Sequence, residues 1–190
     1  MAVIVEKRRL TPAEAEAKVR NGELPEDGSW ELMEGLVVPV VPAKSYHGEV
    51  CLEIGAVIRP WAREIGAKMF DGQTGFIVGQ HRQQVRSPDV SLVTKERLHI
   101  VPDDGFVREA PDLAIEVLSD EQFAESYALA KISEYFGAGC KLVLLFDPKQ
   151  KIIRALEKGS QVWKTYPTDS ELTLDAIAPG FLAKVSSFFP

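Results

Sequence analysis

The pattern of apolar and polar positions predicts a protein of short strands with a few helices. Two runs, 113–118 and 141–146, are almost continuously apolar, which is typical of strands that are buried on both faces of a sheet. The segment between them predicts a helix over about 121–136, closed by Gly137-Ala138-Gly139. A strand, a helix and a strand with a short connection form a βαβ unit, so we expect the two strands to be parallel.

Local signals predict the remaining elements. Thr11-Pro12-Ala13-Glu14 has the residue types that begin a helix, and Gly22 is expected to close it. A second helix begins near Ser45, and Pro60 should kink or end it. A hairpin is expected to turn at Glu34-Gly35. Further strands are expected at 30–33, 36–38, 68–70, 75–78, 87–93 and 152–156, with a loop over 96–110.

Two acidic residues interrupt strands that are otherwise apolar. Glu116 lies in the middle of the run 113–118, and Asp89 lies in the comparable run 87–93. An ionised carboxylate in such a place is costly unless a metal ion, a cation or a reaction pairs with it. Since side chains alternate across a strand, Glu116 shares a face with Ala114, and that face must accommodate the charge.

The helix that follows the Glu116 strand carries a candidate cation. Phe123, Tyr127 and Lys131 lie on one stripe at helical spacing, and the two aromatic residues indicate that this stripe faces the sheet. Lys131 is therefore expected to approach Glu116. Two carboxylates and a lysine suit the hydrolysis of a phosphodiester. The carboxylates, Asp89 and Glu116, would hold Mg²⁺, and the lysine would orient water or stabilise charge in the transition state.

A purely structural interpretation explains the same residues. Asp89 follows Pro88 and could cap a turn, while Glu116 could form an ion pair with Lys131 or Arg108. Spacing alone leaves both interpretations open.

Other polar residues are secondary candidates for the site. Glu34 could add a carboxylate, although a glutamate at a Glu-Gly turn is as often simply exposed. His47, at a helix start, is a candidate ligand or general base, with a capping or core histidine as the alternative. Glu49 and Glu53 lie one helical turn apart and could present an acid to the metal, with a solvated helix face as the alternative.

Length and composition predict one domain, residues 1–190, of an ordinary globular protein. No run approaches the roughly twenty apolar residues of a membrane span, and the apolar stretch at the N-terminus is too short for a signal peptide, so we expect a cytoplasmic protein. Cys51 and Cys140 are expected to be buried free thiols. The apolar segment 185–190 is expected to fold back on the core rather than to form a subunit contact.

The formal net charge is -6 and the sequence pI is about 5.2. This charge argues against a protein that coats nucleic acid without specificity, since such binding needs many contacts from Lys and Arg to phosphates. It does not exclude an enzyme with a local basic face. The basic stretches 7–9 and 81–86 are interpreted as solvated surface.

An ordered set of motifs covers nearly the whole chain and resembles the Uma2 family, which consists of restriction-endonuclease-like proteins in the PD-(D/E)xK nuclease superfamily. The motifs are Glu31-Leu32-Met33-Glu34-Gly35, His47-Gly48, Ser87-Pro88-Asp89-Val90-Ser91-Leu92-Val93, Pro111-Asp112-Leu113-Ala114-Ile115-Glu116-Val117-Leu118-Ser119, Lys131-Ile132-Ser133-Glu134-Tyr135-Phe136-Gly137-Ala138-Gly139, Leu144-Leu145-Phe146-Asp147-Pro148 and Pro179-Gly180-Phe181.

This resemblance implies an α/β fold with a restriction-endonuclease-like core, in which helices flank a mixed central β-sheet and an N-terminal helix and β-hairpin are added. It places the superfamily's aspartate at Asp89 and its glutamate at Glu116. The usual lysine, two residues after the glutamate, is replaced by Leu118. In this family the lysine has moved to the next helix, at the position of Lys131.

Three functions are compatible with the sequence. The resemblance favours a Mg²⁺-dependent endonuclease, with Mn²⁺ as a possible substitute, that acts on DNA as a homodimer in which each subunit cuts one strand. A catalytically silent nuclease fold that serves as a binding or assembly module is the alternative, which Leu118 and the acidic net charge favour. A third function is the hydrolysis of another phosphodiester, such as RNA or a small nucleotide. No base-reading module is recognisable.

Overall fold

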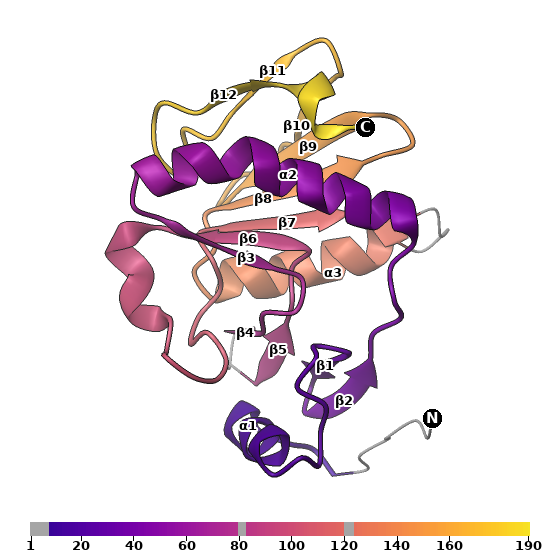
Figure 1. Ribbon diagram of the computed structural model, residues 1–190, viewed down its shortest axis with the longest axis vertical. Coiled ribbons are helices and arrows are strands. Elements are labelled where there is room, and N and C mark those ends of the chain that lie inside the picture. Colours follow the sequence, from indigo (N-terminus) through magenta and orange to yellow (C-terminus); the bar gives the residue numbers. More distant parts are fainter. Residues whose placement is uncertain (1–7, 80–82, 120–123) are drawn as a thin grey trace.

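The protein is built around a six-stranded mixed sheet (Figure 1). The structure is a computed structural model that describes residues 8–79, 83–119 and 124–190. In the last of these ranges, side chains are described from residue 128 onward. The strand order is β10-β9-β8-β7-β6-β3. β7 and β8 are parallel, as the βαβ pattern predicts, and the other neighbours are antiparallel. The strands are β3 (Lys68–Asp71), β6 (Val90–Val93), β7 (Leu113–Val117), β8 (Leu142–Asp147), β9 (Ile152–Glu157) and β10 (Lys164–Tyr166).

Helices cover both faces of this sheet, as Figure 1 shows. α2 (Ser45–Glu64) packs on one face against Leu113, Ile115 and Val117 of β7, while α3 (Ala124–Gly137) packs on the other face, where Ala114 lies. The alternation along β7 therefore separates two apolar clusters. Glu116 points to the α3 side, as the sequence predicts.

Pro60 is expected from the sequence to kink or end α2, and the structure shows that it does not end the helix. The helix continues to Glu64, although a proline inside a helix removes one backbone hydrogen bond. Ile58, Trp61 and Ala62 are buried on both sides of the proline, and their packing against the sheet holds the last turn in place.

A smaller sheet with the order β2-β1-β5-β4 lies beside the central one. It consists of β1 (Trp30–Met33), β2 (Leu36–Pro39), β4 (Phe76–Val78) and β5 (Gln84–Arg86), and α1 (Pro12–Arg20) packs near it. Thr11 and Glu14 form the predicted capping box of α1. The predicted hairpin turns at Glu34 and Gly35, which adopt φ values of 50° and 82°.

The basic stretch that contains β5 is not the solvated surface that the sequence indicated. Arg86 is only 1% exposed, because the smaller sheet and α3 enclose it and acidic side chains neutralise it. His81 and Arg82 lie outside the described residues. The predicted loop over 96–110 also differs, because it contains the 3-10 helix η1 (Lys95–Ile100), whose last residue, Ile100, is buried in the core on the α3 side.

The C-terminal segment packs beside α2 over the same face of the central sheet (Figure 1). It forms the two-stranded sheet of β11 (Glu171–Thr173) and β12 (Leu182–Lys184), followed by the 3-10 helix η2 (Val185–Phe188). The rings of Phe188 and Phe189 pack against Phe146 of β8, with centroids 5.4 and 5.9 Å apart. The expected return of this segment to the core is therefore confirmed. Among the described residues, no helix has the length and apolar character needed to cross a membrane.

Candidate active site

The pairing of β6 with β7 brings the two predicted carboxylates together. Val90 pairs with Ile115 in antiparallel register, so the preceding residue, Asp89, lies beside Glu116. The Oδ2 atom of Asp89 accepts a 2.7 Å hydrogen bond from the backbone N–H of Val117. Asp89 therefore lies directly before the first residue of β6, with its carboxylate held against β7. Its side chain keeps 24% of its surface exposed, whereas that of Glu116 keeps 9%.

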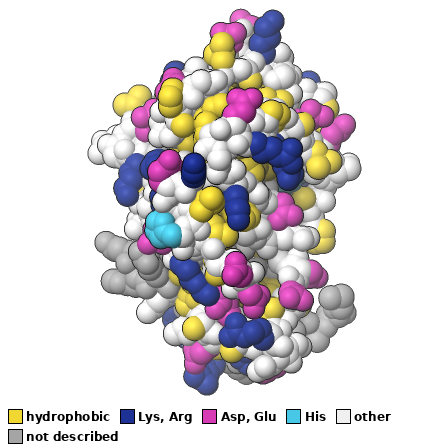
Figure 2. Space-filling model, turned by 60° about the vertical axis from the view of Figure 1, so that its left-hand side comes forward, with side chains coloured by type: hydrophobic (Ala, Val, Ile, Leu, Met, Phe, Trp, Pro, Cys, Tyr) yellow, Lys and Arg dark blue, Asp and Glu magenta, His cyan; other side chains and the backbone are white. Residues whose placement is uncertain are grey.

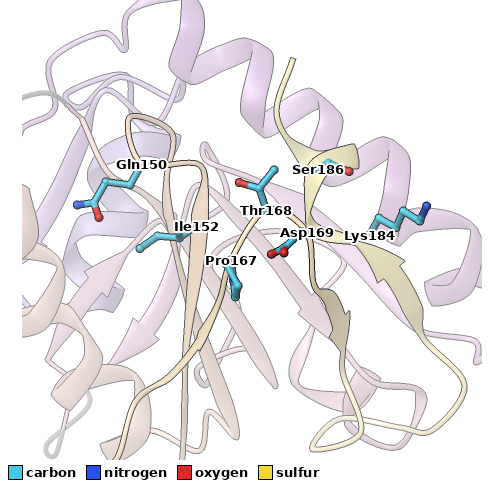
Figure 3. A pocket seen from close by; sticks show the side chains of 7 residues that line it. All are labelled: Gln150, Ile152, Pro167, Thr168, Asp169, Lys184 and Ser186. Atoms are coloured by element: carbon cyan, nitrogen blue, oxygen red, sulfur yellow. The ribbon is translucent and has the colours of Figure 1, made fainter.

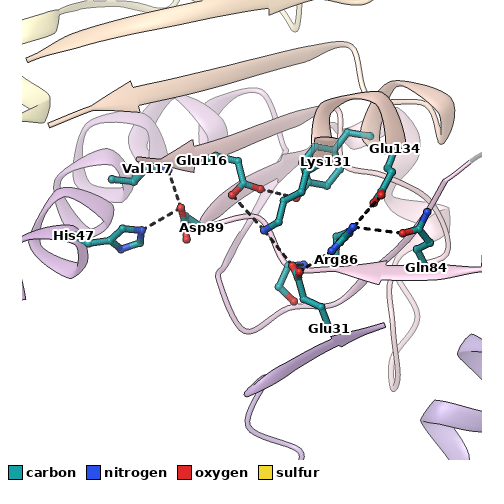
Figure 4. A network of polar contacts seen from close by, with 11 residues as sticks. Glu31, His47, Gln84, Arg86, Asp89, Glu116, Val117, Lys131 and Glu134 are labelled. Atoms are coloured by element: carbon teal, nitrogen blue, oxygen red, sulfur yellow. Dashed lines mark hydrogen bonds and ion pairs between the residues drawn. The ribbon is translucent and has the colours of Figure 1, made fainter. Parts of the chain in front are cut away.

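α3 contributes two side chains to Glu116, of which Lys131 is labelled in Figure 4. The Nζ atom of Lys131 lies 3.4 Å from Oε2 of Glu116, and the Tyr135 hydroxyl donates a 2.6 Å hydrogen bond to Oε1. Lys131 and Tyr135 are four residues apart, so one helical stripe carries both. The structure thus brings Asp89, Glu116 and Lys131 together. Phe123 and the side chain of Tyr127, which the sequence placed on the same stripe, lie outside the described part.

A second carboxylate reaches Lys131 from the smaller sheet. Oε1 of Glu31, on β1, lies 3.1 Å from Nζ of Lys131, and its Oε2 accepts a 3.0 Å hydrogen bond from Arg86. Arg86 also donates hydrogen bonds of 2.6 and 2.9 Å to Glu134 of α3. This buried chain of charges, which Figure 4 shows, joins the smaller sheet to the helix that carries Lys131.

Sequence reasoning missed Glu31, Arg86 and Tyr135. In sequence, Glu31 alternates with apolar residues as a solvated position in a hairpin would, and Arg86 belongs to a polar stretch. The one usable signal is Tyr135, which lies four residues after Lys131 on the stripe already assigned to the sheet.

Burial dominates the electrostatics of Glu116. It raises the pKa of this carboxyl to about 7, and the negative charges of Asp89 and Glu31 act in the same direction. The ammonium of Lys131 and the hydrogen bond from Tyr135 oppose that rise. The surroundings of Glu116 therefore satisfy a negative charge at this position only in part.

His47, on α2, lies on the other side of Asp89. Its Nε2 atom is 3.2 Å from Oδ2 of Asp89, and its Nδ1 atom is 3.6 Å from Sγ of Cys51 (the contact with Asp89 is drawn in Figure 4). The hydrogen bond with Asp89 is the main cause that raises the pKa of His47 to about 10. The imidazole is therefore charged at neutral pH and does not act as a base while it keeps this contact.

Cys51 is half-buried and faces a histidine, so the expectation of a buried thiol is wrong for this residue and confirmed for Cys140. The difference arises because Cys51 lies on the flank of α2 next to His47, whereas Cys140 lies inside the α3-side cluster.

The structure leaves the other candidates outside this cluster. The side chain of Glu34 is 77% exposed and lies 3.7 Å from Arg9, because the hairpin turn projects it outward. On α2, Glu49 is exposed and Glu53 is half-buried. Within the described part of the chain, neither of them lies close to two other potential metal ligands. Arg108, the alternative partner of Glu116, pairs instead with Glu16 at 2.7 Å.

A hollow of about 350 Å³ opens onto the site. Glu31, Asp89 and Lys131 line it, and the exposed residues Val40 and Val41, which follow β2, form part of its wall. A wider hollow of about 610 Å³ lies near the C-terminal sheet, between the segment of Pro167, Thr168 and Asp169 and the side chains of Lys184 and Ser186 (Figure 3). None of the predicted site residues lines that second hollow.

The donor atoms around Asp89 and Glu116 fit a hard divalent cation. Both residues offer carboxylate oxygens, and Mg²⁺ is usually held by one or two carboxylates together with water and substrate phosphate. Within the described part of the chain, Oδ1 of Asp89 has no hydrogen bond, whereas Oδ2 has two. The pKa of Glu116, which burial and the neighbouring carboxylates raise, indicates a place where added positive charge is favourable.

Comparisons with known proteins identify a family and a shared fold. The model of the Uma2 family, described as "Putative restriction endonuclease", matches residues 19–186. A solved structure, described as a "putative nuclease belonging to DUF820 from Anabaena variabilis", superposes with a TM-score of 0.65 at 19% sequence identity. The similarity covers 89% of this chain and 94% of that one, and it shows a common fold. No curated protein matches the chain.

Proposed function

Because this chain belongs to the Uma2 family of restriction-endonuclease-like proteins, we propose that it is a divalent-metal-dependent endonuclease that hydrolyses phosphodiester bonds of DNA. The observation that carries the proposal is the meeting of Asp89, Glu116 and Lys131 beside an open hollow that Asp89 and Lys131 line. Asp89 and Glu116 would hold the metal, with Mg²⁺ the simplest ion and Mn²⁺ a substitute.

Each side chain has a role that follows from its contacts. A divalent cation at Asp89 and Glu116 would polarise the scissile phosphate and lower the pKa of a water molecule. Lys131, held between Glu31 and Glu116, would place its ammonium next to the charge that develops on the phosphate oxygens. Tyr135 fixes the orientation of the Glu116 carboxylate, and His47 does the same for Asp89.

The surface charge favours a local contact with DNA rather than a long basic groove. Figure 2 shows Lys and Arg side chains in separate groups among Asp and Glu on the face drawn, outside its grey residues. Together with the net charge of -6, this supports binding through the site and its rim. A DNA substrate is in keeping with a cytoplasmic location.

The proposal includes a homodimer. One Asp89/Glu116 site cuts one strand, and two copies of the chain would supply the two sites that a double-strand cut needs. Analytical ultracentrifugation with and without duplex DNA tests this part, and a protein that stays monomeric while it cuts both strands would contradict it.

The experiment that tests the activity is cleavage of supercoiled and linear DNA with Mg²⁺ or Mn²⁺. We expect Asp89→Asn, Glu116→Gln and Lys131→Met to lower the cleavage rate by at least about 100-fold each. Glu157→Gln serves as a matched control, because Glu157 is an exposed glutamate on β9 of the same sheet. Full activity in all three site variants, each shown to be folded, would exclude this site.

A catalytically silent binding module is the alternative, and one observation favours it. Both carboxylate oxygens of Glu116 have partners within the protein, Tyr135 and Lys131, as a structural ion pair would. Metal-dependent thermal unfolding separates the two functions, since an ion at a hundred times its Kd adds about 2.7 kcal/mol of stability. Stabilisation of the wild type that Glu116→Gln abolishes supports the nuclease, and no stabilisation of either protein supports the silent module.

A further inference from the structure

Three donor atoms of different chemistry meet beside the proposed nuclease site. His47 and Cys51 lie four residues apart on one side of α2, and Asp89 faces them from the start of β6. A nitrogen of His47, the sulfur of Cys51 and a carboxylate oxygen of Asp89 all lie within 4.8 Å of one another. In the described ranges, no other set of three His, Cys, Asp or Glu side chains is this close.

We propose that His47, Cys51 and Asp89 form a binding site for a borderline-soft transition metal ion such as Zn²⁺ or Co²⁺. An imidazole nitrogen, a thiolate and a carboxylate oxygen are the donors that Zn²⁺ takes in proteins, and three protein ligands leave a fourth position for water. Mg²⁺, in contrast, avoids sulfur and takes oxygen donors. The donor set therefore separates this site from the carboxylate pair of Asp89 and Glu116.

The site is accessible and needs only a small rearrangement. The side chains of His47 and Asp89 are 17% and 24% exposed, and Cys51 is half-buried, so an ion reaches them from solvent. In a tetrahedral site with ligand bonds of about 2.0–2.3 Å, the donor atoms lie less than about 4 Å apart. Here the three donor atoms lie within 4.8 Å of one another, so they must move slightly closer together when an ion binds. Small side-chain rotations of the three ligands would close that gap. The ion replaces the protons of the ligands, so binding strengthens as pH rises.

Asp89 belongs to both sites, which gives the transition metal a regulatory effect. An ion held by His47, Cys51 and Asp89 takes up a carboxylate oxygen that the hard cation of the nuclease site requires, and it adds positive charge next to that cation. Zn²⁺ therefore inhibits the Mg²⁺-dependent cleavage. This consequence rests on the proposed function, whereas the binding of Zn²⁺ or Co²⁺ does not.

Titration with Co²⁺ tests the site directly, because a cobalt–thiolate bond gives a charge-transfer absorption in the near ultraviolet. We expect this band in the wild type, in Glu116→Gln and in Cys140→Ala, and its loss in Cys51→Ser with at least a tenfold weaker affinity. Cys140 is the matched control, since it is the other free thiol and lies buried in the core. Absence of the band in the wild type, or its persistence in Cys51→Ser, would overturn the proposal.

Alkylation by iodoacetamide needs no substitution and covers the case in which Cys51→Ser does not fold. Zn²⁺ should slow the labelling of Cys51 in the native protein at least tenfold, as measured on the peptide that contains it. An unchanged labelling rate with saturating Zn²⁺ would contradict the site.

A third measurement concerns inhibition. Zn²⁺ should block Mg²⁺-dependent cleavage by the wild type at a concentration at least ten times lower than for Cys51→Ser. If the chain cleaves no DNA under any condition, the proposed function fails while the Co²⁺ and alkylation results still decide the metal site. Equal sensitivity of two active proteins to Zn²⁺ would overturn the regulatory effect.

Discussion

The hydroxyl of Tyr135 donates a 2.6 Å hydrogen bond to the carboxylate of Glu116, inside a part of the core where that carboxylate is almost entirely removed from water. The bond favours the charged form of Glu116 and works against the burial that raises its pKa to about 7. Tyr135 thus affects the ionisation of Glu116, although it does not line the hollow of about 350 Å³ at the site.

Replacement of Tyr135 by Phe should move the pH dependence of metal binding upward. A metal ion binds the ionised form of Glu116, so affinity rises with pH through about 7 in the wild type. Loss of a hydrogen bond to a charged group is worth about 1.5 kcal/mol, so the midpoint should rise by about one pH unit. Isothermal titration of Mn²⁺ between pH 5.5 and 9 measures it, and an unchanged midpoint in a folded variant would contradict the coupling.

Lys131→Met should destabilise the protein more at pH 8 than at pH 5. The ammonium lies between Glu31 and Glu116, and removal of one partner from a buried ion pair costs about 3 kcal/mol. Without it, the pKa of Glu116 in the folded protein rises further above the unfolded value. A carboxyl of that kind binds a proton on folding, so stability falls as pH rises between the two values. Urea unfolding at both pH values measures this difference. An equal loss in the free energy of unfolding at pH 5 and pH 8 would show that Lys131 does not stabilise the ionised carboxylates.

Asp112 should contribute stability that acid removes. Its side chain is fully buried, which alone would raise its pKa, but Lys141, the backbone N–H of Thr94 and Arg97 together hold the pKa below its usual value. Since the folded pKa is the lower one, this stability is complete above the unfolded pKa of about 4 and is lost as pH falls through the folded pKa.

Asp112→Asn should therefore lower the free energy of unfolding by about 3 kcal/mol at pH 7. Below about pH 4, the difference in free energy of unfolding between the variant and the wild type should become smaller. Asp175→Asn, at an exposed position, is the control with the same change of charge. Chemical denaturation across the pH range provides the measurement. If this difference stays constant down to pH 2, the ionisation of Asp112 is not the source of the lost stability.

Pro60→Ala should stabilise the protein without a change in its activity. Pro60 is exposed inside α2, where it removes a backbone hydrogen bond, and alanine restores that bond. The unfolded chain has more conformational entropy with alanine than with proline at this position, which offsets part of the stabilisation. The net increase in the free energy of unfolding should be about 1–2 kcal/mol. A higher urea midpoint at an unchanged m-value would show this gain, whereas a lower midpoint would mean that the proline relieves strain in the last turn.

Most of the central sheet could be predicted from the sequence because its signals are local. The two apolar strands and the helix between them are contiguous, so spacing alone placed Lys131 over Glu116. The place of Asp89 and Glu116 in apolar strands indicated that both belong to one site, and the resemblance of short motifs to a family supported that assignment.

The surroundings of the site could not be predicted, because they depend on contacts between distant segments. Glu31 and Arg86 are 55 positions apart and meet only when β1 pairs with β5 and α3 covers both. The contact between His47 and Asp89, 42 positions apart, depends on how α2 lies across the sheet. Glu34 has the same chemistry as Glu31, and only the turn geometry separates an exposed side chain from a buried one.

The packing of Phe188 and Phe189 against Phe146 has a consequence for proteolysis. The two rings belong to the same apolar cluster as α2, which loses part of its cover without them. α2 carries His47, which touches Asp89 at the site. A protease that cuts the chain before residue 188 would therefore leave the helix that carries His47 open to solvent on one side.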